Sequence, residues 1–260
     1  MSPPGARGPR RVGKQRLDLL LVERGLAESR ARAQALILAG RVIVDERRRD
    51  KPGEAVPVDA RVKVKGGSDW ASRGAGKLLG ALEAWPWLAE RVRGARCLDI
   101  GASTGGFTDV LLHHGAQAVV ALDVGYGQLH WKLQRDPRVT VMDRTNIRYV
   151  TPADLPWAPD LATSDASFIS VRLFLPSVFA LLRPGGVFVA LVKPQFEVGR
   201  ERVGKGGVVR DEAVRQSALD DVRQAATELG FDVLGAVDSP VAGPKGNREF
   251  LLGLGKPEAA

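Results

Sequence analysis

The sequence predicts an α/β protein: a mostly parallel sheet with helices on both faces, preceded by a small N-terminal α+β domain. From residue 97 to residue 192, short apolar runs alternate with segments of helical periodicity. Such alternation implies right-handed crossovers and a parallel sheet. The last two apolar runs are joined by too few residues for a crossover helix, so the last of seven expected strands should be antiparallel.

The excess basic charge lies in the N-terminal quarter of the chain. The sequence has 38 Lys and Arg residues against 30 Asp and Glu, and residues 1–65 hold 16 of the cations but 8 of the carboxylates. The whole net charge of +8 therefore lies in this segment. A localised basic field is typical of a module that binds nucleic acid, although a basic tail can also serve only solubility.

The N-terminal segment should contain two short helices. Residues 1–14 are rich in Pro, Gly and Arg without apolar periodicity, which indicates a disordered basic arm. Helical spacing then begins at Arg16 and stops at Gly25, and Ser29 can cap a second helix that ends at Gly40.

A small sheet should follow these helices. Val42 to Val44 and Val62 to Val64 alternate as strands, and Arg47-Arg48-Arg49 with Pro52-Gly53 is expected to form a basic turn between them. The predicted organisation is an arm over 1–14, a small domain over 15–65, a linker over 66–71, a second domain over 72–256 and a tail over 257–260.

The second domain is organised around a glycine-rich turn. An apolar run that starts at Cys97 breaks into glycines after Asp99, and helical spacing resumes at Val110. Glycine lets the backbone approach a ligand closely, and the following helix directs free N–H groups at it. A second apolar run ends at Asp123, whose carboxylate can accept both hydroxyls of a ribose, so the spacing suits adenosine.

The later strands also end on charged residues. They are Val139–Met142, Leu161–Ser164 and Val187–Val192, which end at Asp143, Asp165 and Lys193. Ligands of parallel sheets gather at the C-terminal ends of the strands, so these residues are site candidates together with Asp99 and Asp123.

The remaining elements are helices, loops and two final strands. Helices are expected over 171–182 and 211–229, and strands over 231–237 and 249–254. Gly199 to Lys205 fits a G-x-x-x-x-G-K phosphate loop, but Gly206 follows where a hydroxyl should hold Mg²⁺. We interpret that segment as a mobile substrate loop.

Composition excludes several classes of protein. No apolar run approaches eighteen residues and no signal-peptide core follows the N-terminus, so a cytoplasmic protein without membrane contact is expected. The single cysteine, Cys97, lies in an apolar strand and should be a buried structural thiol. His113, His114 and His130 lack zinc-ligand spacing with it, so no structural metal is expected.

The N-terminal segment resembles the S4 RNA-binding domain from residue 16 to about residue 64. The match is the pattern R-L-D-x-L-L-V-x-x-G-L-A-x-S-R-x-x-A-x-x-L-I-x-x-G-x-V-x-V, and it departs where many S4 domains have Asn-Gly, since this chain has Asp45-Glu46. The resemblance implies one basic face for RNA, although a merely solvated helix face is the alternative. That face would comprise Arg16, Arg30, Arg32 and Arg41.

The glycine-rich turn has the form D-I-G-x-x-x-G-G-F-T, which does not fit the G-x-G-x-x-G register of NAD-binding proteins. It resembles motif I of S-adenosylmethionine (SAM)-dependent methyltransferases. The resemblance implies a Rossmann-like class I fold and SAM as the cofactor. The implied cofactor-binding residues are Asp99, Gly101, Ala102, Ser103, Thr104, Gly105, Gly106, Phe107, Thr108, Asp123 and Asp143.

Three kinds of methyl acceptor were weighed. A pyrimidine carbon commonly needs a thiol nucleophile, and Cys97 should be buried. An exocyclic amine usually goes with an Asp/Asn-Pro-Pro-Tyr signature, which residues 164–167 do not have. A ribose hydroxyl needs an oxygen that loses its proton as it attacks, and a lysine such as Lys193 can accept that proton.

Lys77, Asp165, Lys193 and Glu249 match the K-D-K-E tetrad of FtsJ-like RNA 2′-O-methyltransferases. With the S4 pattern and the segments D-x-S-F-I-S, V-K-P-Q-F-E and G-N-x-E-F, the chain closely resembles the TlyA (haemolysin A) family over residues 16 to about 255. This implies 2′-O-methylation of cytidine in 16S ribosomal RNA, 23S ribosomal RNA or both, on naked RNA or on ribosomal subunits.

The resemblance also implies a role for each site residue. Lys193 would activate the 2′-hydroxyl and Asp165 would position both the lysine and the methyl group. Lys77 and Glu249 would orient the nucleotide and tune the charge. Asp123 would hold the cofactor ribose, and Asp143 would lie near its adenine.

Two other functions stay open at this point. A catalytically silent RNA-binding or ribosome-assembly factor is disfavoured by the intact tetrad, and a membrane-active haemolysin by the lack of a membrane span. The sequence leaves the oligomeric state undetermined.

Overall fold

The protein is described by a computed structural model that covers residues 13–27, 29–65 and 70–259. These residues fall into two compact units, one on each side of residues 66–69. Most of the expected basic arm, four residues of the expected linker and residue 260 lie outside the described residues. Each unit has its own hydrophobic core.

The first unit packs two helices on small sheets, as the S4 resemblance predicts. Strand β2 pairs antiparallel with β3 and β5, and β1 pairs antiparallel with β4. Ser29 caps α2 as expected, because its hydroxyl accepts the Arg32 N–H. The elements are β1 Lys14–Arg16, α1 Leu17–Glu23, α2 Arg30–Leu38, β2 Val42–Val44, β3 Arg47–Arg49, β4 Ala55–Pro57 and β5 Val62–Val64.

Two expectations for this unit are wrong. Arg47–Arg49 is a strand rather than a basic turn, because the chain reverses earlier, at Asp45 and Glu46, whose φ angles are +46° and +66°. A tight hairpin needs positive φ at both central residues, and Asp45 supports it by accepting the Arg61 N–H at 2.8 Å. The basic arm is also shorter than expected, since Lys14 already pairs with Pro57.

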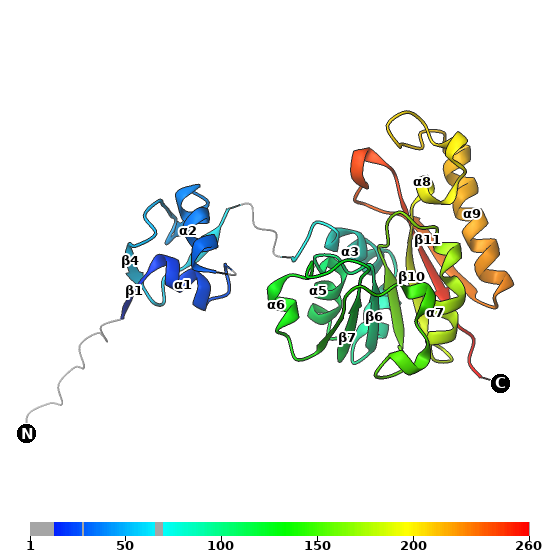
Figure 1. Ribbon diagram of the computed structural model, residues 1–260, viewed down its shortest axis with the longest axis horizontal. Coiled ribbons are helices and arrows are strands. Elements are labelled where there is room, and N and C mark those ends of the chain that lie inside the picture. Colours follow the sequence, from blue (N-terminus) through cyan, green and yellow to red (C-terminus); the bar gives the residue numbers. More distant parts are fainter. Residues whose placement is uncertain (1–12, 28, 66–69, 260) are drawn as a thin grey trace, which may run out of the picture. The chain divides into compact units, whose positions relative to one another are not determined.

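The second unit is built on a seven-stranded sheet (Figure 1). The strand order is β11-β12-β10-β9-β6-β7-β8. The five strands β10, β9, β6, β7 and β8 are parallel to one another, and β12 is antiparallel to both of its neighbours, β11 and β10. The predicted mostly parallel sheet with a reversed last strand is confirmed. Its strands are β6 Arg96–Ile100, β7 Ala118–Leu122, β8 Val139–Met142, β9 Leu161–Ser164, β10 Val187–Val192, β11 Asp232–Asp238 and β12 Phe250–Gly255.

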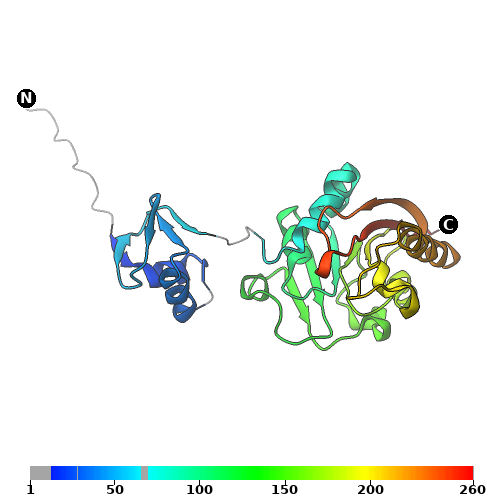
Figure 2. The same ribbon diagram turned by 90° about the horizontal axis from the view of Figure 1, so that it is seen from above.

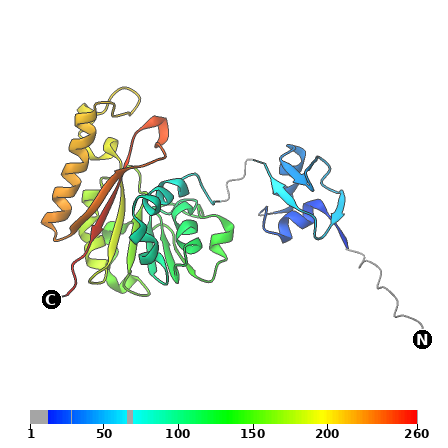
Figure 3. The ribbon, with the colours of Figure 1, turned by 180° about the vertical axis from the view of Figure 1, so that it is seen from behind.

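Helices cover both faces of this sheet, as Figures 1 and 2 show. Alternate residues of a strand point to opposite faces. In β6, Leu98 and Ile100 join the core under α7 and α9, whereas Cys97 joins the core under α3, α4 and α5. Figure 3 shows α9 beside the last strands, in yellow to orange. The helices are α3 Ala75–Ala84, α4 Pro86–Val92, α5 Gly106–His113, α6 Trp131–Gln134, α7 Leu175–Leu181, α8 Pro194–Glu197 and α9 Glu212–Glu228.

The expected single helix over 171–182 is wrong, because it is broken at Phe174. A 3₁₀ turn over Val171–Leu173 precedes α7, and Phe174 between them has φ −123° and ψ 0°. Pro176 has no N–H to continue a helix from the preceding turn, but it is well accommodated in the first turn of a new one.

Other features bear on the expected class of protein. Cys97 is buried, as predicted, and burial raises the pKa of its thiol. No three His, Cys, Asp or Glu side chains of the described residues are grouped as metal ligands. None of the described helices combines the length and apolarity needed to cross a membrane.

Candidate active site

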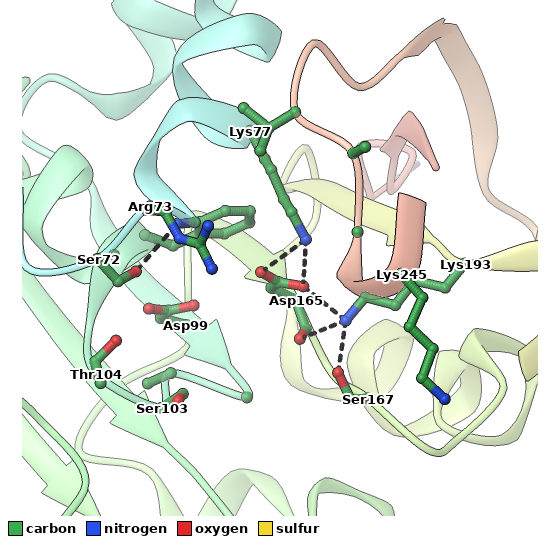
Figure 4. A pocket seen from close by; sticks show the side chains of 18 residues that line it. Ser72, Arg73, Lys77, Asp99, Ser103, Thr104, Asp165, Ser167, Lys193 and Lys245 are labelled. Atoms are coloured by element: carbon green, nitrogen blue, oxygen red, sulfur yellow. Dashed lines mark hydrogen bonds and ion pairs between the residues drawn. The ribbon is translucent and has the colours of Figure 1, made fainter. Parts of the chain in front are cut away.

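A cavity of about 470 Å³ opens at the C-terminal ends of β6, β9 and β10 (Figure 4). Its volume falls within the range of about 300–1,000 Å³ that is typical of small-molecule sites. All of its lining residues belong to the second unit. They are Ser72, Arg73, Gly74, Lys77, Asp99, Gly101–Thr104, Gly106, Phe107, Asp165, Ser167, Lys193, Val241–Gly243 and Lys245.

The glycine-rich turn forms one wall of the cavity, and its glycine positions leave no room for side chains. Gly101 has φ +75°, and a Cβ there would lie 2.9 Å from the Ala166 backbone. A Cβ on Gly106 would lie 2.9 Å from the Ala75 amide nitrogen. Gly105, at φ +94°, caps α5 and packs against leucines rather than facing the cavity. A backbone cradle of this kind fits an adenosine-containing cofactor.

Asp99 is fully buried beneath the cradle and braces it. Its carboxylate accepts the Thr108 hydroxyl of α5 at 2.7 Å and the Thr163 hydroxyl of β9 at 3.2 Å. Burial raises the pKa of the Asp99 carboxyl from 3.8 to about 6, against the opposing effect of these hydrogen bonds. Thr108 does not line the cavity and acts through Asp99, which does.

The raised pKa of Asp99 predicts a pH-dependent stability of the second unit. Between about pH 4 and pH 6 the folded state holds a proton that the unfolded state has lost, so the free energy of unfolding should fall as pH rises through this window. The expected change is on the order of 3 kcal/mol and should be absent in Asp99→Asn. Tryptophan fluorescence in urea reports on this unit alone, since all five tryptophans lie in it. Parallel pH profiles for both proteins would contradict the assignment.

The two other candidate cofactor carboxylates lie at the ends of β7 and β8. Asp123 accepts the Ser103 N–H at 2.8 Å and the Gly125 N–H at 2.7 Å, which ties the end of β7 to the glycine-rich turn. Asp143 accepts the Gly127 N–H at 2.9 Å. Both are at strand ends as expected, but neither lines the cavity itself.

The four tetrad residues meet although they come from distant parts of the sequence. Lys77, Asp165 and Lys193 lie on the opposite wall of the cavity (Figure 4), and Glu249 is buried in contact with Lys77. Lys77 lies in α3, whereas Asp165 follows β9 and Lys193 follows β10. Glu249 precedes β12, and because β12 is antiparallel to β10, its start lies beside the end of β10. The antiparallel last strand is therefore what brings Glu249 to the same edge of the sheet.

Lys193 is held by three oxygen atoms. Its Nζ lies 2.7 Å from Asp165 Oδ1, and it donates to the Asp165 carbonyl at 3.1 Å and to the Ser167 hydroxyl at 2.7 Å. An ammonium group has three N–H donors, so all of them have partners. The amine is thus fixed in position, with Asp165 Oδ1 as the closest acceptor for one of its protons.

Glu249 is fully buried and has an incomplete hydrogen-bond set. Its Oε2 lies 2.8 Å from Lys77 Nζ, but the contact lacks hydrogen-bond geometry, and neither carboxylate oxygen has a hydrogen-bond partner among the described residues. Lys77 also donates to Asp165 at 3.3 Å. Lys77 is therefore the cation that links both carboxylates of the site.

Replacing Lys77 alone should destabilise the fold more than replacing both Lys77 and Glu249. Lys77→Met leaves the Glu249 carboxylate buried without a counter-charge, which should lower the free energy of unfolding by about 3–5 kcal/mol. Lys77→Met/Glu249→Leu should recover much of that loss but no activity. Urea unfolding followed by tryptophan fluorescence measures both effects. A double variant less stable than Lys77→Met would contradict the burial argument.

Several cavity residues were not singled out from the sequence. Ser72 and Arg73 line the wall between the cradle and Lys77, and Lys245 lines the outer side near Lys193 (Figure 4). Ser167, the serine of the D-x-S-F-I-S segment, accepts a hydrogen bond from the Lys193 amine. The serines and Arg73 stand within four or five residues of tetrad members, which was the available signal. Lys245 stands four residues before Glu249, so the same signal was available for it.

An exposed aromatic side chain follows Ser167. Phe168 is 91% exposed and has φ +65°, a strained conformation for a bulky residue. Its ring lies 5.3 Å from that of Phe196. Such strain is often found at functional sites, and an exposed ring suits contact with a base.

The four arginines expected to bind RNA all lie in the first unit. Arg16 and Arg30 both contact the buried Asp18 carboxylate at 2.9 Å, which holds the pKa of that carboxyl well below its usual value. Arg41 donates its Nε to the Lys65 carbonyl at 2.9 Å. Arg32 is exposed in the first turn of α2. The structure thus brings Arg16 and Arg30 together, and their charge is partly neutralised by Asp18.

Comparison with known proteins agrees with this architecture. The FtsJ-like methyltransferase family matches residues 70–256, and the S4 domain matches residues 15–62. YqxC of Bacillus subtilis, a candidate rRNA methyltransferase, is 51% identical over 93% of this chain and 85% of its own. The 16S/23S rRNA (cytidine-2′-O)-methyltransferase TlyA of Mycobacterium tuberculosis is 49% identical over 93% of this chain and 90% of its own. Among solved structures, a candidate hemolysin from Streptococcus thermophilus is 43% identical with a TM-score of 0.71, over 95% of this chain and 90% of that chain.

Proposed function

The chain belongs to the FtsJ-like methyltransferase family, and on that premise we propose that it transfers a methyl group from SAM to a ribose 2′-hydroxyl of ribosomal RNA. The observation that carries the proposal is the meeting of Lys77, Asp165, Lys193 and Glu249 beside a glycine-rich cradle. When bound, SAM would supply the methyl group at an electrophilic sulfonium.

Lys193 is the group proposed to take the proton of the 2′-hydroxyl. Its Nζ faces the cavity but is engaged by two hydrogen bonds and an ion pair as an ammonium group, so it must first release a proton. Asp165 Oδ1, at 2.7 Å, is the acceptor within reach. Lys193 Nζ then receives the hydroxyl proton while Ser167 and the Asp165 carbonyl keep the amine in place.

Lys77 and Glu249 are proposed to keep Asp165 ready for that exchange. Lys77 contacts the carboxylates of both Asp165 and Glu249. A change in the charge of Asp165 therefore changes the electrostatic interaction of Lys77 with Glu249. On the other wall, residues 101–108 would hold the cofactor, with Asp123 on its ribose and Asp143 near its adenine. Asp99 would act by bracing the turn, since its oxygens are bound to Thr108 and Thr163.

The first unit supports RNA as the substrate class. It matches the S4 domain and carries the basic excess of the chain. In the second unit, Phe168 adds an exposed ring one residue after Ser167. TlyA of Mycobacterium tuberculosis acts on cytidine in 16S and 23S rRNA, and we extend that substrate to this chain. Such a substrate would place the protein in the cytoplasm.

Nucleoside mass spectrometry tests this proposal. Ribosomal subunits from cells that lack the gene would be incubated with the purified protein and isotopically labelled SAM, and the RNA digested to nucleosides. We expect the label on the sugar fragment of a cytidine. Label on a base fragment would reject the proposal. If no methyl group were transferred to either subunit or to naked rRNA, the result would instead favour a catalytically silent RNA-binding factor.

Arginines of the first unit should contribute to RNA affinity in a salt-dependent way. Replacing both Arg32 and Arg41 with alanine removes two expected phosphate contacts, each worth about 0.7–0.9 in the slope of log K against log salt. The slope should therefore fall by about 1.4–1.8 in a filter-binding or fluorescence titration. Arg16 and Arg30 are left intact because they neutralise buried Asp18.

The matched control is Arg93→Ala. Arg93 is an exposed cation before β6, at the edge of the sheet opposite the cavity. Equal slopes for the double variant, this control and the wild type would show that the first unit's charge serves only solubility.

A further inference from the structure

Two loops carry exposed cations and lie against each other, and one of them lines the cavity beside Lys193. They are the segment over 199–209 and the turn over 243–246, of which the turn lines the cavity. Of their four exposed cations, Arg202 donates to the Ser217 hydroxyl at 3.2 Å, and we call the other three, Arg200, Lys205 and Lys245, the basic rim. No ion pair or hydrogen bond joins these three side chains to any other described residue. The inference drawn from them rests on the proposed function, because it concerns how the same site holds its RNA.

Asn247 fixes the two loops to each other. It is only 3% exposed, its Oδ1 accepts the Val209 N–H at 3.0 Å, and its Nδ2 donates to the Gly207 carbonyl at 2.9 Å. Its own carbonyl accepts the Gly243 N–H at 2.8 Å. These three hydrogen bonds of the buried Asn247 hold the two loops together, and we call this arrangement the Asn247 clamp. The clamp fixes the backbone that carries the basic rim.

Lys245 is the rim cation that reaches the cavity. It has φ +62°, a conformation that is uncommon for a residue with a side chain, and it lines the same cavity as Lys193. In Figure 4 its side chain runs past Lys193 and its amine lies away from Asp165. A Cβ on Gly207 would lie 3.8 Å from Lys245 Nζ, so the clamped loop passes close to the amine.

The tetrad itself cannot supply the charge that a phosphate needs. It holds two lysines and two carboxylates in mutual contact, so its formal charges cancel. The ribose carbon that bears the 2′-oxygen is bonded to the carbon that carries the 3′-phosphate. A 2′-hydroxyl placed at Lys193 must therefore bring that phosphate to the neighbourhood of Lys193, where the basic rim begins.

We infer that Lys245, positioned by the Asn247 clamp, binds the RNA phosphate on the 3′ side of the methylated ribose. Lys205 and Arg200 lie on the segment over 199–209, which Asn247 joins to the turn of Lys245. They extend the positive charge along the RNA strand. Phosphate contacts fix the register of a nucleic acid without reading its sequence. The contact would thus set which 2′-hydroxyl meets Lys193, independently of the base.

The test compares Lys245→Ala with Arg93→Ala in steady-state methyl transfer and in RNA titration at several salt concentrations. Lys245→Ala should raise the KM for RNA about tenfold, with a smaller effect on kcat, and lower the salt slope by about 0.7. Its SAM affinity should equal that of the wild type, and Arg93→Ala should match the wild type throughout. A loss of SAM affinity in Lys245→Ala would overturn the inference, because the amine would then face the cofactor.

A second variant tests the clamp. Asn247→Ala should raise the KM for RNA, and Lys245→Ala/Asn247→Ala should be little worse than Asn247→Ala alone, since the misplaced lysine no longer contributes. Tryptophan fluorescence in urea verifies that each variant is folded. Fully additive effects would overturn the role of Asn247.

The outcomes separate this inference from the proposed function. Wild-type KM and salt slope in Lys245→Ala, with the methyl group still found on ribose, would overturn the phosphate contact alone. A wild-type protein that methylates a base, or nothing, would overturn the proposed function instead.

Discussion

Lys193→Ala should abolish methyl transfer while leaving SAM affinity nearly unchanged. The Lys193 amine lies at the tetrad, where Asp165 and Ser167 hold it, whereas the cofactor cradle is built from residues 101–108 on the other wall. Loss of a positioned proton acceptor typically costs about 10²–10⁴-fold in rate. Single-turnover transfer and calorimetric titration with SAM measure the two quantities separately.

Lys193→Arg is the variant that separates proton transfer from simple electrostatics. The guanidinium keeps the positive charge beside Asp165 but cannot lose a proton under working conditions. It should therefore be nearly as inactive as the alanine variant. If either variant kept more than a few per cent of wild-type turnover, Lys193 would not be the proton acceptor.

The fold of the second unit could be predicted because its strands are continuous apolar runs between glycine-rich turns. Residues 139–142, 161–164 and 187–192 are strands with the expected bounds. Every residue of β9 and β10 is buried, as in a sheet covered on both faces, whereas β8 lies at the edge of the sheet and is partly exposed. The reversed last strand followed from a short connection. These are local signals, and tertiary contacts did not override them.

The break before α7 and the hairpin at Asp45 depend on weaker signals. A proline in a helical pattern is compatible either with a kink or with a new first turn, and here the second occurs at Pro176. Asp45-Glu46 has no glycine to mark positive φ, so the run of arginines after it resembled a turn rather than a strand.

The candidate site was predictable only in part from local pattern. Asp165 and Lys193 end parallel strands, which is where ligands gather. Lys77 lies inside a helix and Glu249 before an antiparallel strand, so only the family resemblance pointed to them. Asn247 belongs to the G-N-x-E-F segment and Lys245 precedes it, but the roles of both could not be predicted, because they depend on contacts between two loops about forty residues apart.

A substrate RNA with one 2′-deoxy nucleotide at the target position should bind normally and accept no methyl group. The phosphates that Lys245 and the first unit would contact are unchanged by the substitution, so affinity and salt slope should equal those of the ordinary RNA. Transfer should fall to background, because the oxygen that Lys193 would deprotonate is missing. Filter binding and transfer of labelled methyl groups, measured on the same RNA, give both results.

The matched control carries the 2′-deoxy nucleotide one position away from the target. It keeps the reacting hydroxyl and should be methylated at close to the normal rate, which separates loss of the acceptor from altered sugar pucker or local RNA structure. A methyltransferase acting on a base would modify both RNAs, since each retains its bases. Undiminished transfer to the target-substituted RNA would therefore reject Lys193 as an activator of a ribose hydroxyl, whatever the Lys193→Ala result.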